Sequence, residues 1–329
     1  MLNNRYEILE QLGRGGFGET FLAIDTRMPS RRKCVIKQLK PDDTTNTAPT
    51  PGWFEKRFQR EAAILEELGR NNRQIPQLYE YFSEGENFFF VQEWIEGITL
   101  SQKHQREGNL SEAEVEKILR ELLPVLDYIH GRGIIHRDIK PDNIILRASD
   151  GKPVLIDFGI VKEVNNINVG SKTVSLGTPG YMAPEQIAGH PVFSSDLYSL
   201  GLTAIFLLTG KTPQALTSDP NTGEILWRKD APGLHSNLAA VIDRAVRFHP
   251  RDRFTSAQEM WFFGLCYAMD WGYKGWNPYV ERHLAIFVNC FLSRANSSIK
   301  SFAREGFSQF MPPYRTITSN EEPVSSRAK

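Results

Sequence analysis

The chain has 329 residues, of which 40% are hydrophobic and 24% charged, and 39 Lys and Arg balance 39 Asp and Glu at zero net charge. This composition is ordinary for a globular protein and excludes a long disordered chain, which needs low hydrophobicity and high net charge. The neutral balance gives no reason to expect nucleic acid as a partner, and a length above about 250 residues predicts two lobes or domains.

The first 95 residues predict a small sheet with one major helix. Alternating or short apolar runs bounded by turn formers indicate strands, and an apolar stripe at helical spacing indicates the helix. A polar stretch without periodicity, residues 41–52, is expected to be a loop. The expected strands are residues 6–12, 20–25, 34–39, 77–82 and 87–93, and the expected helix is residues 53–69.

From Ser111 the pattern becomes helical. Ser111 and Glu114 have capping-box spacing and begin an apolar stripe that Gly131 and Gly133 are expected to end. Short apolar runs then predict a strand pair, and longer ones predict helices, so the second half is expected to be mainly helical. The strand pair is expected at residues 143–146 and 153–157, and the helices at about residues 196–209, 237–248 and 256–267.

The C-terminal residues, the apolar stretches, the first residues and the cysteines add further expectations. Asn277 and Pro278 are expected to begin one further helix, and residues 319–329 are expected to be disordered. No apolar stretch approaches the about 20 residues that a membrane-spanning helix needs, and the first residues lack the pattern of a signal peptide. Three widely spaced cysteines predict neither a disulfide framework nor a zinc site, which favours a cytoplasmic location.

A glycine-rich turn follows the first strand. Gly13, Gly15 and Gly18 have the G-x-G-x-x-G spacing, which a dinucleotide-binding turn shares. A dinucleotide-binding fold needs a helix after the third glycine, whereas residues 20–25 predict another strand. Glycines between two strands let main-chain amides approach phosphate oxygens, although a flexible hairpin also accounts for this motif taken alone.

Two charged residues, Lys37 and Glu61, indicate a nucleotide site only if they form a pair. Lys37 alternates with apolar residues in its strand, and Glu61 lies 24 residues further on, in the expected helix. Taken singly, each is typical of a solvated surface. A lysine beside phosphates needs a carboxylate to orient it, so these two side chains are expected to pair if the site binds nucleotide.

Three later segments carry the clearest signal: His-Arg-Asp-Ile-Lys-Pro-Asp-Asn at 136–143, Asp-Phe-Gly at 157–159 and Ala-Pro-Glu at 183–185. With these residues the chain resembles the eukaryotic-type (Hanks-type) serine/threonine protein kinases, including their soluble bacterial members. The glycine turn, Lys37, Glu61 and the three segments follow one another in family order over about residues 6–264. Lys140 and the segment GTPGYMAPE are typical of the serine/threonine branch.

The resemblance implies an α+β, two-lobed protein-kinase fold in residues 1–264, with a small sheet lobe to about residue 95 and a larger helical lobe after it. Residues 265–329 would be a C-terminal extension. It also implies transfer of the ATP γ-phosphate to Ser and Thr hydroxyls of protein substrates, with ATP and Mg²⁺ bound between the lobes. Neither nucleic acid nor a membrane span is expected, and the oligomeric state stays open.

The resemblance also assigns roles to individual residues. Asp138 would orient the acceptor hydroxyl and take its proton, Lys140 would meet the γ-phosphate, and Lys37, held by Glu61, would bind the α- and β-phosphates. Asn143 and Asp157 would hold Mg²⁺, because carboxylate and amide oxygens suit a hard cation. The residues expected to contact ATP are Leu12, Gly13, Gly15, Gly16, Gly18, Thr20, Val35, Lys37, Gln92, Glu93, Ile95 and Ile145.

Further positions are expected to support or regulate the site. By resemblance, Thr178 would contact the catalytic loop, Asp196 would brace its main chain, and Arg253 would pair with Glu185. Arg137 favours control by phosphorylation of the loop that follows Gly159, because a phosphate would gain charge-assisted bonds to it. The candidate acceptors are Ser171, Thr173 and Ser175; a polar loop without regulation would show the same residues.

Two other functions remain as alternatives. A pseudokinase would bind nucleotide or partners without transfer, but such proteins typically lack at least one of Lys37, Asp138, Asn143 and Asp157, and all four are present. A kinase of small molecules on a related fold would not be expected to carry GTPGYMAPE, which resembles a platform for protein substrates. Phosphorylation of a peptide rather than a metabolite would distinguish this second alternative.

Overall fold

The structure is a computed structural model of the chain. It describes residues 1–15, 18–39, 53–85, 87–158, 162–163, 177–234 and 236–269. The chain divides into two units, Met1–Trp271 and Gly272–Lys329, and the helices and strands of the described residues all belong to the first. Some expectations lie outside the described residues: the loop at 41–52, Gly16, the C-terminal helix and tail, and the candidate acceptors Ser171, Thr173 and Ser175.

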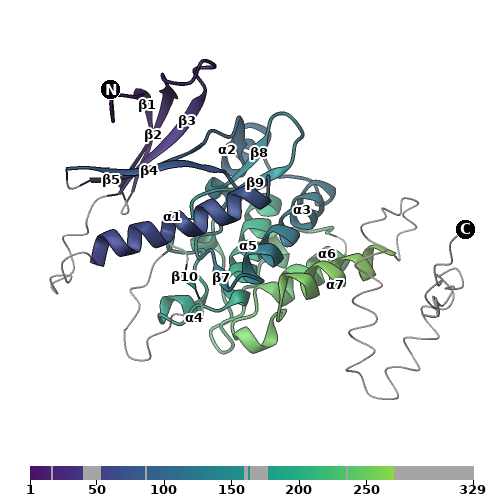
Figure 1. Cartoon of the computed structure of the whole chain (residues 1–329). Helices are drawn as coiled ribbons and strands as arrows, with labels where there is room; N and C mark the ends of the chain where they lie inside the picture. Colours follow the sequence, from purple (N-terminus) through teal and green to yellow (C-terminus); the bar gives the residue numbers. More distant parts are fainter. Residues whose placement is uncertain are drawn as a thin grey trace, which may run out of the picture. The chain divides into compact units, whose positions relative to one another are not determined.

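The N-terminal part is a five-stranded antiparallel sheet beside one long helix (Figure 1). The strands lie in the order β1-β2-β3-β5-β4, so the sheet crosses over once, between β3 and β4. Helix α1 packs against β4. All five expected strands and the expected helix are confirmed: β1 (Tyr6–Gly15), β2 (Gly18–Asp25), β3 (Lys33–Leu39), α1 (Trp53–Asn71), β4 (Leu78–Glu84) and β5 (Asn87–Glu93).

Alternation along the strands buries apolar side chains on both sides of this sheet. On the α1 side, the ring of Phe58 stacks on Phe90 with centroids 4.6 Å apart. On the other side, Tyr6 and Phe89 belong to a smaller buried cluster. Strand β1 departs from this pattern, because its side chain Leu12 is 41% exposed despite its even spacing from Tyr6. The even spacing therefore predicted the strand correctly but did not make Leu12 a core residue.

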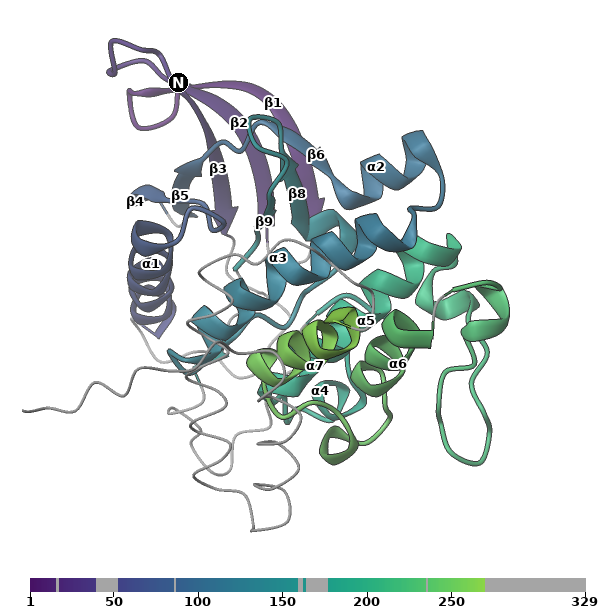
Figure 2. The same ribbon diagram turned by 90° about the vertical axis from the view of Figure 1, so that its right-hand side faces the viewer.

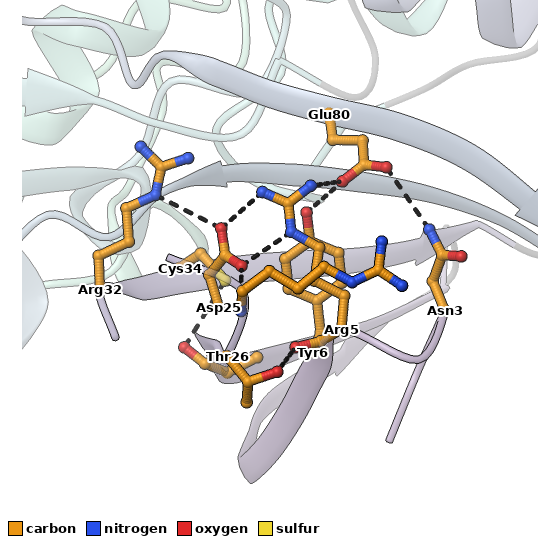
Figure 3. A network of polar contacts seen from close by, with 10 residues as sticks. Asn3, Arg5, Tyr6, Asp25, Thr26, Arg32, Cys34 and Glu80 are labelled. Atoms are coloured by element: carbon orange, nitrogen blue, oxygen red, sulfur yellow. Dashed lines mark hydrogen bonds and ion pairs between the residues drawn. The ribbon is translucent and has the colours of Figure 1, made fainter. Parts of the chain in front are cut away.

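A polar network ties the chain's first residues to the sheet (Figure 3). Arg5 donates to both carboxylate oxygens of Asp25, at 2.8 and 2.7 Å, and to Glu80 at 2.8 Å. Tyr6 also donates to Glu80. Asp25 is only 1% exposed, and its hydrogen bonds from Arg5 hold its pKa below the ordinary value despite burial. The network joins β1, β2 and β4 at the end of the sheet.

The remaining part is mainly helical, as expected. Helices α3, α5, α6 and α7 pack on one another and form a group apart from the five-stranded sheet (Figure 2). Within the described part of the chain, no helix is both long and apolar enough to cross a membrane. The elements are β6 (Gly97–Thr99), α2 (Leu100–Glu107), α3 (Glu112–His130), β7 (Ile134–Ile135), η1 (Pro141–Asn143), β8 (Ile144–Arg147), β9 (Pro153–Leu155), β10 (Lys162–Glu163), α4 (Pro184–Ile187), α5 (Phe193–Thr209), η3 (Pro213–Ala215), η4 (Arg228–Asp230), α6 (Ser236–Ala245), η5 (Pro250–Asp252) and α7 (Ala257–Met269).

Several boundaries follow from local chemistry. Helix α3 begins with the expected capping box, in which the Ser111 hydroxyl and the Glu114 carboxylate each accept from the other residue's main-chain N–H. The expected pair β8 and β9 is antiparallel, with Ile145 opposite Val154. Helix α5 begins three residues before the expected Asp196, and α6 ends three residues before the expected Phe248.

Candidate active site

The Asp196 carboxylate holds the main chain of the expected catalytic loop, residues 136–143. Asp196, in the first turn of α5, is 0% exposed and accepts main-chain N–H bonds from His136 at 2.9 Å and Arg137 at 2.8 Å. Arg137 adopts φ +71°, a conformation that a non-glycine residue keeps only where its surroundings enforce it. The expected brace by Asp196 is confirmed.

A histidine outside the motif completes this brace. His130, at the end of α3, lies with Nε2 2.8 Å from the same Asp196 oxygen that accepts from the His136 amide. Burial raises the pKa of Asp196, but the bond from His130 and the main-chain donors outweigh it and hold that pKa below its ordinary value. The sequence did not indicate a role for His130, because no motif or spacing marks it.

Asp138 lies at the centre of a ring of polar contacts. One of its carboxylate oxygens accepts from the Thr178 amide at 2.9 Å and from the Thr178 hydroxyl at 2.6 Å. The other accepts from the Asn143 amide at 2.9 Å and lies 3.2 Å from the Lys140 ammonium. Lys140 also donates to the Thr178 hydroxyl at 2.6 Å. The predicted contact between Thr178 and the catalytic loop is therefore confirmed, and the carboxylate of Asp138 is held in one orientation.

Lys37 and Asp157 come together from distant parts of the chain. Lys37 projects from β3 and forms an ion pair with Asp157, which follows β9. Burial raises the pKa of Asp157, but the positive charge of Lys37 outweighs it, so the pKa lies below the ordinary value and the carboxylate is ionised. Glu61 is buried on α1. Its pairing with Lys37 stays a prediction.

Packing of the next residue, Phe158, holds Asp157 in place. Phe158 is buried and packs edge-on against the His136 ring, with centroids 4.7 Å apart. Burial lowers the pKa of His136, so this ring is neutral. Its Nε2 donates to the Ile156 carbonyl at 3.1 Å, and its other nitrogen accepts from the Asp138 amide at 3.3 Å. One uncharged ring thus links the catalytic loop to the residues on both sides of Asp157.

The residues expected to contact ATP come from several strands. Thr20 on β2 lies opposite Lys37, and Val35 on β3 lies opposite the buried Gln92 on β5. Glu93 ends β5 and Ile95 lies in the short link to β6, while Ile145 lies on β8. Contact of these residues with ATP stays a prediction.

The glycines of the turn differ in their surroundings. Gly18 has φ +134°, and a Cβ there would lie 1.8 Å from the Gln38 carbonyl, so β3 can approach β2 only beside glycine. A Cβ on Gly13 would meet no atom within 4 Å. Gly18 therefore has a structural role in the sheet, whereas Gly13 adjoins open space.

The predicted pair of Arg253 with Glu185 is confirmed. Arg253 is fully buried and donates to both Glu185 oxygens, at 2.7 and 2.9 Å. It also donates to the main-chain carbonyls of Arg247 at 2.6 Å and Phe248 at 2.8 Å. This pair fixes the start of α4 to the segment between α6 and α7.

Comparison with known proteins agrees with this geometry. The family model of the protein kinase domain matches residues 6–261. The chain is 67% identical over 265 residues to "Serine/threonine-protein kinase C" of Synechocystis sp., covering 79% of this chain and 49% of that protein. It is 57% identical over 265 residues to "Serine/threonine-protein kinase PknA" of Nostoc sp., covering 79% and 47%.

A more distant relative matches the same part of the chain. "Serine/threonine-protein kinase PknB" of Mycobacterium tuberculosis is 32% identical over 276 residues, covering 79% of this chain and 42% of that protein. The chain thus spans about half the length of the curated relatives it matches.

Proposed function

The chain belongs to the protein kinase domain family, and we propose that it transfers the γ-phosphate of ATP to serine and threonine hydroxyls of proteins. The observation that carries this proposal is the contact ring around Asp138. A carboxylate held by Thr178 and Asn143 beside the Lys140 ammonium has the fixed orientation and the adjacent positive charge that phosphoryl transfer needs.

The residues present fit a magnesium ion together with nucleotide phosphates. Asp157 offers an ionised carboxylate, and the Asn143 nitrogen already donates to Asp138, which leaves the Asn143 carbonyl oxygen as a metal ligand. Among the described residues, no group of three or more His, Cys, Asp and Glu side chains could hold a metal by itself. Mg²⁺ would therefore depend on phosphate oxygens for further ligands and would neutralise their charge when bound.

Each charged side chain of the site would have its own role in the reaction. Asp138 would orient the acceptor hydroxyl and take its proton as the bond to phosphorus forms. Lys140 would stabilise negative charge on the transferred group. Lys37 would exchange its contact with Asp157 for the α- and β-phosphates, with Glu61 as its expected partner.

Two further proposals concern the location of the protein and its regulation. The chain would act in the cytoplasm, which the small number and wide spacing of its cysteines favour. It would phosphorylate itself at Ser171, Thr173 or Ser175, and the phosphate would order the segment through Arg137.

The metal site offers a direct test through binding. Asp157→Asn should lower the affinity for ATP in the presence of Mg²⁺ at least about tenfold, because a charged ligand is lost, and should leave the weaker metal-free binding nearly unchanged. Asp150→Asn is the matched control, since Asp150 is exposed and pairs with Arg147 at the turn between β8 and β9. Calorimetric titration with and without Mg²⁺ measures both. An Asp157→Asn chain that keeps the parent's Mg²⁺-dependent affinity would contradict this assignment.

The acceptor class is tested by transfer itself. The parent chain with ATP and Mg²⁺ should label serine and threonine in protein or peptide, and should not label small alcohols such as sugars. Labelling of small alcohols alone would favour the small-molecule kinase. Nucleotide binding without any transfer would favour the pseudokinase.

A further inference from the structure

Residues 178–181 form a tight turn directly beside Asp138. The Tyr181 amide donates to the Thr178 carbonyl at 3.1 Å, and Gly180 has φ +96°. Proline at the second position and a positive-φ glycine at the third are the signature of a type II turn. Thr178, the first residue of this turn, donates to the Asp138 carboxylate, so the turn begins beside the group that would meet an acceptor hydroxyl.

In such a turn, the carbonyl of the second residue has no partner within the turn, and Gln214 supplies one. The Gln214 amide nitrogen donates to the Pro179 carbonyl at 2.7 Å. A Cβ on Gly180 would lie 2.2 Å from that nitrogen and 2.6 Å from the amide carbon, so the amide group lies closely over the glycine. The positive φ of Gly180 favours glycine at this position, and the Gln214 amide group packs directly against it.

Two residues that hold the turn in place, Ser199 and Gln214, lie on α5 and in the segment that follows it. Ser199 on α5 donates to the Tyr181 carbonyl at 2.8 Å. Gln214 lies in η3, a single turn in which the Ala215 amide donates to the Thr212 carbonyl at 2.9 Å. Three points of the turn are thus fixed: Thr178 by Asp138, Pro179 by Gln214 and Tyr181 by Ser199.

The exposed part of the turn is where a polypeptide acceptor would lie. An acceptor hydroxyl at Asp138 brings its flanking residues across the surface beside Thr178, since each extended residue spans only about 3.3 Å. Pro179 and Gln214 are both exposed there. The Gln214 amide uses its nitrogen on Pro179, and within the described part of the chain its carbonyl oxygen accepts no hydrogen bond. That oxygen is available to a main-chain N–H of a bound peptide.

We propose that Gln214 is a positioning residue for polypeptide substrates: it holds the Pro179–Gly180 peptide in place and offers its carbonyl oxygen to the acceptor's main chain. This rests on the proposed kinase function. It makes Gln214 important for the residues flanking the acceptor, and not for ATP or for the proton transfer at Asp138. A small alcohol or a single capped acceptor residue would not reach it.

The test compares the parent chain with Gln214→Ala and Gln214→Glu, and with Thr212→Ala as the control on the same exposed turn. Synthetic serine and threonine peptides serve as acceptors, in a long form of about ten residues and as a single capped residue. Gln214→Ala should raise the KM of the long peptide about fivefold, which corresponds to one neutral hydrogen bond, with kcat and the KM of ATP unchanged. Gln214→Glu should do at least the same, because a carboxylate cannot donate to the Pro179 carbonyl. The capped residue should be phosphorylated equally well by parent and variants.

Two results would overturn the proposal. One is an unchanged KM for the long peptide in variants whose melting temperature equals the parent's. The other is a loss of kcat that is the same for long and short acceptors, which would make Gln214 a structural residue only. A parent chain that binds ATP and Mg²⁺ but phosphorylates no peptide would instead contradict the proposed kinase function, and this inference with it.

Discussion

At the scale of single residues, Thr178 connects the Asp138 carboxylate, the Lys140 ammonium and the 178–181 turn. It donates to Asp138, accepts from Lys140 and begins the turn that Gln214 supports. Because a hydroxyl both donates and accepts, it can join a carboxylate to an ammonium without adding charge. The orientation of Asp138 therefore depends on the Thr178 hydroxyl.

Replacing Thr178 tests that dependence. Thr178→Val keeps the shape and the main-chain bond but removes the hydroxyl, so kcat should fall roughly tenfold to a hundredfold, because small losses of orientation are costly in transfer reactions. Thr178→Ser keeps the hydroxyl and should stay within about threefold of the parent. Steady-state kinetics with a peptide acceptor, together with titration of ATP, would measure both. Weakened ATP binding in Thr178→Val, with kcat preserved, would be the opposite of what we expect.

The sequence predicted the residues of the site unequally. Asp138, Asn143 and Asp157 were recognisable because they stand at fixed distances within short motifs. His130 and Gln214 were not, because their roles depend on contacts with segments 66 and 35 residues away and no local pattern marks either. The contact of Lys37 with Asp157, 120 residues apart, likewise required the folded chain.

At the scale of elements, the Arg253–Glu185 pair joins the start of α4 to the segment between α6 and α7. Arg253 donates to one carboxylate and three main-chain carbonyls, and its guanidinium lies 4.6 Å from the Tyr198 ring centre. Loss of the cation would leave Glu185 with the Ser195 hydroxyl but without both guanidinium donors, and would remove the guanidinium donor from each of these carbonyls. The arrangement predicts a large cost for its removal.

Arg253→Met should therefore lower the free energy of unfolding by about 3–5 kcal/mol. The control is Arg251→Met, two residues earlier, where the side chain is 82% exposed and no measurable change is expected. Urea unfolding followed by tryptophan fluorescence compares the two. Equal stability of the two variants would show that the buried pair contributes nothing.

Predictability of the elements followed the length and regularity of their patterns. The long amphipathic helices α1 and α3 and the strands β1 to β5 were all predicted. Helix α2 was missed, although Thr99 and Gln102 form a capping box there, because its residues are mostly polar and carry no apolar stripe. The short strands β6, β7 and β10 arise from pairing with distant segments, which local sequence does not encode.

At the scale of the whole molecule, buried titratable groups in both parts of the fold make stability depend on pH. Hydrogen bonds from Arg5 lower the pKa of Asp25, and the bond from His130 outweighs burial to lower that of Asp196. Burial lowers the pKa of His136. In all three cases the unfolded chain binds more protons than the folded one, so stability rises with pH.

The free energy of unfolding should accordingly be highest near neutral pH. It should begin to fall below about pH 6.5, where His136 would be protonated in the unfolded chain, and fall more steeply below about pH 4 as the two aspartates take up protons. Urea unfolding at a series of pH values and constant ionic strength measures this. A stability that stays constant or rises from pH 7 to pH 4 would contradict the assigned directions.

The measurement closest to the central claim is autophosphorylation with labelled ATP and Mg²⁺. It compares the parent chain with Asp138→Asn and Lys37→Met, and with Lys33→Met as a control at an exposed position of the same strand. The account predicts label on serine or threonine of the parent and of Lys33→Met, and a loss of at least about a hundredfold in the other two. Undiminished labelling of Asp138→Asn, or no transfer by a parent chain that binds nucleotide, would contradict it.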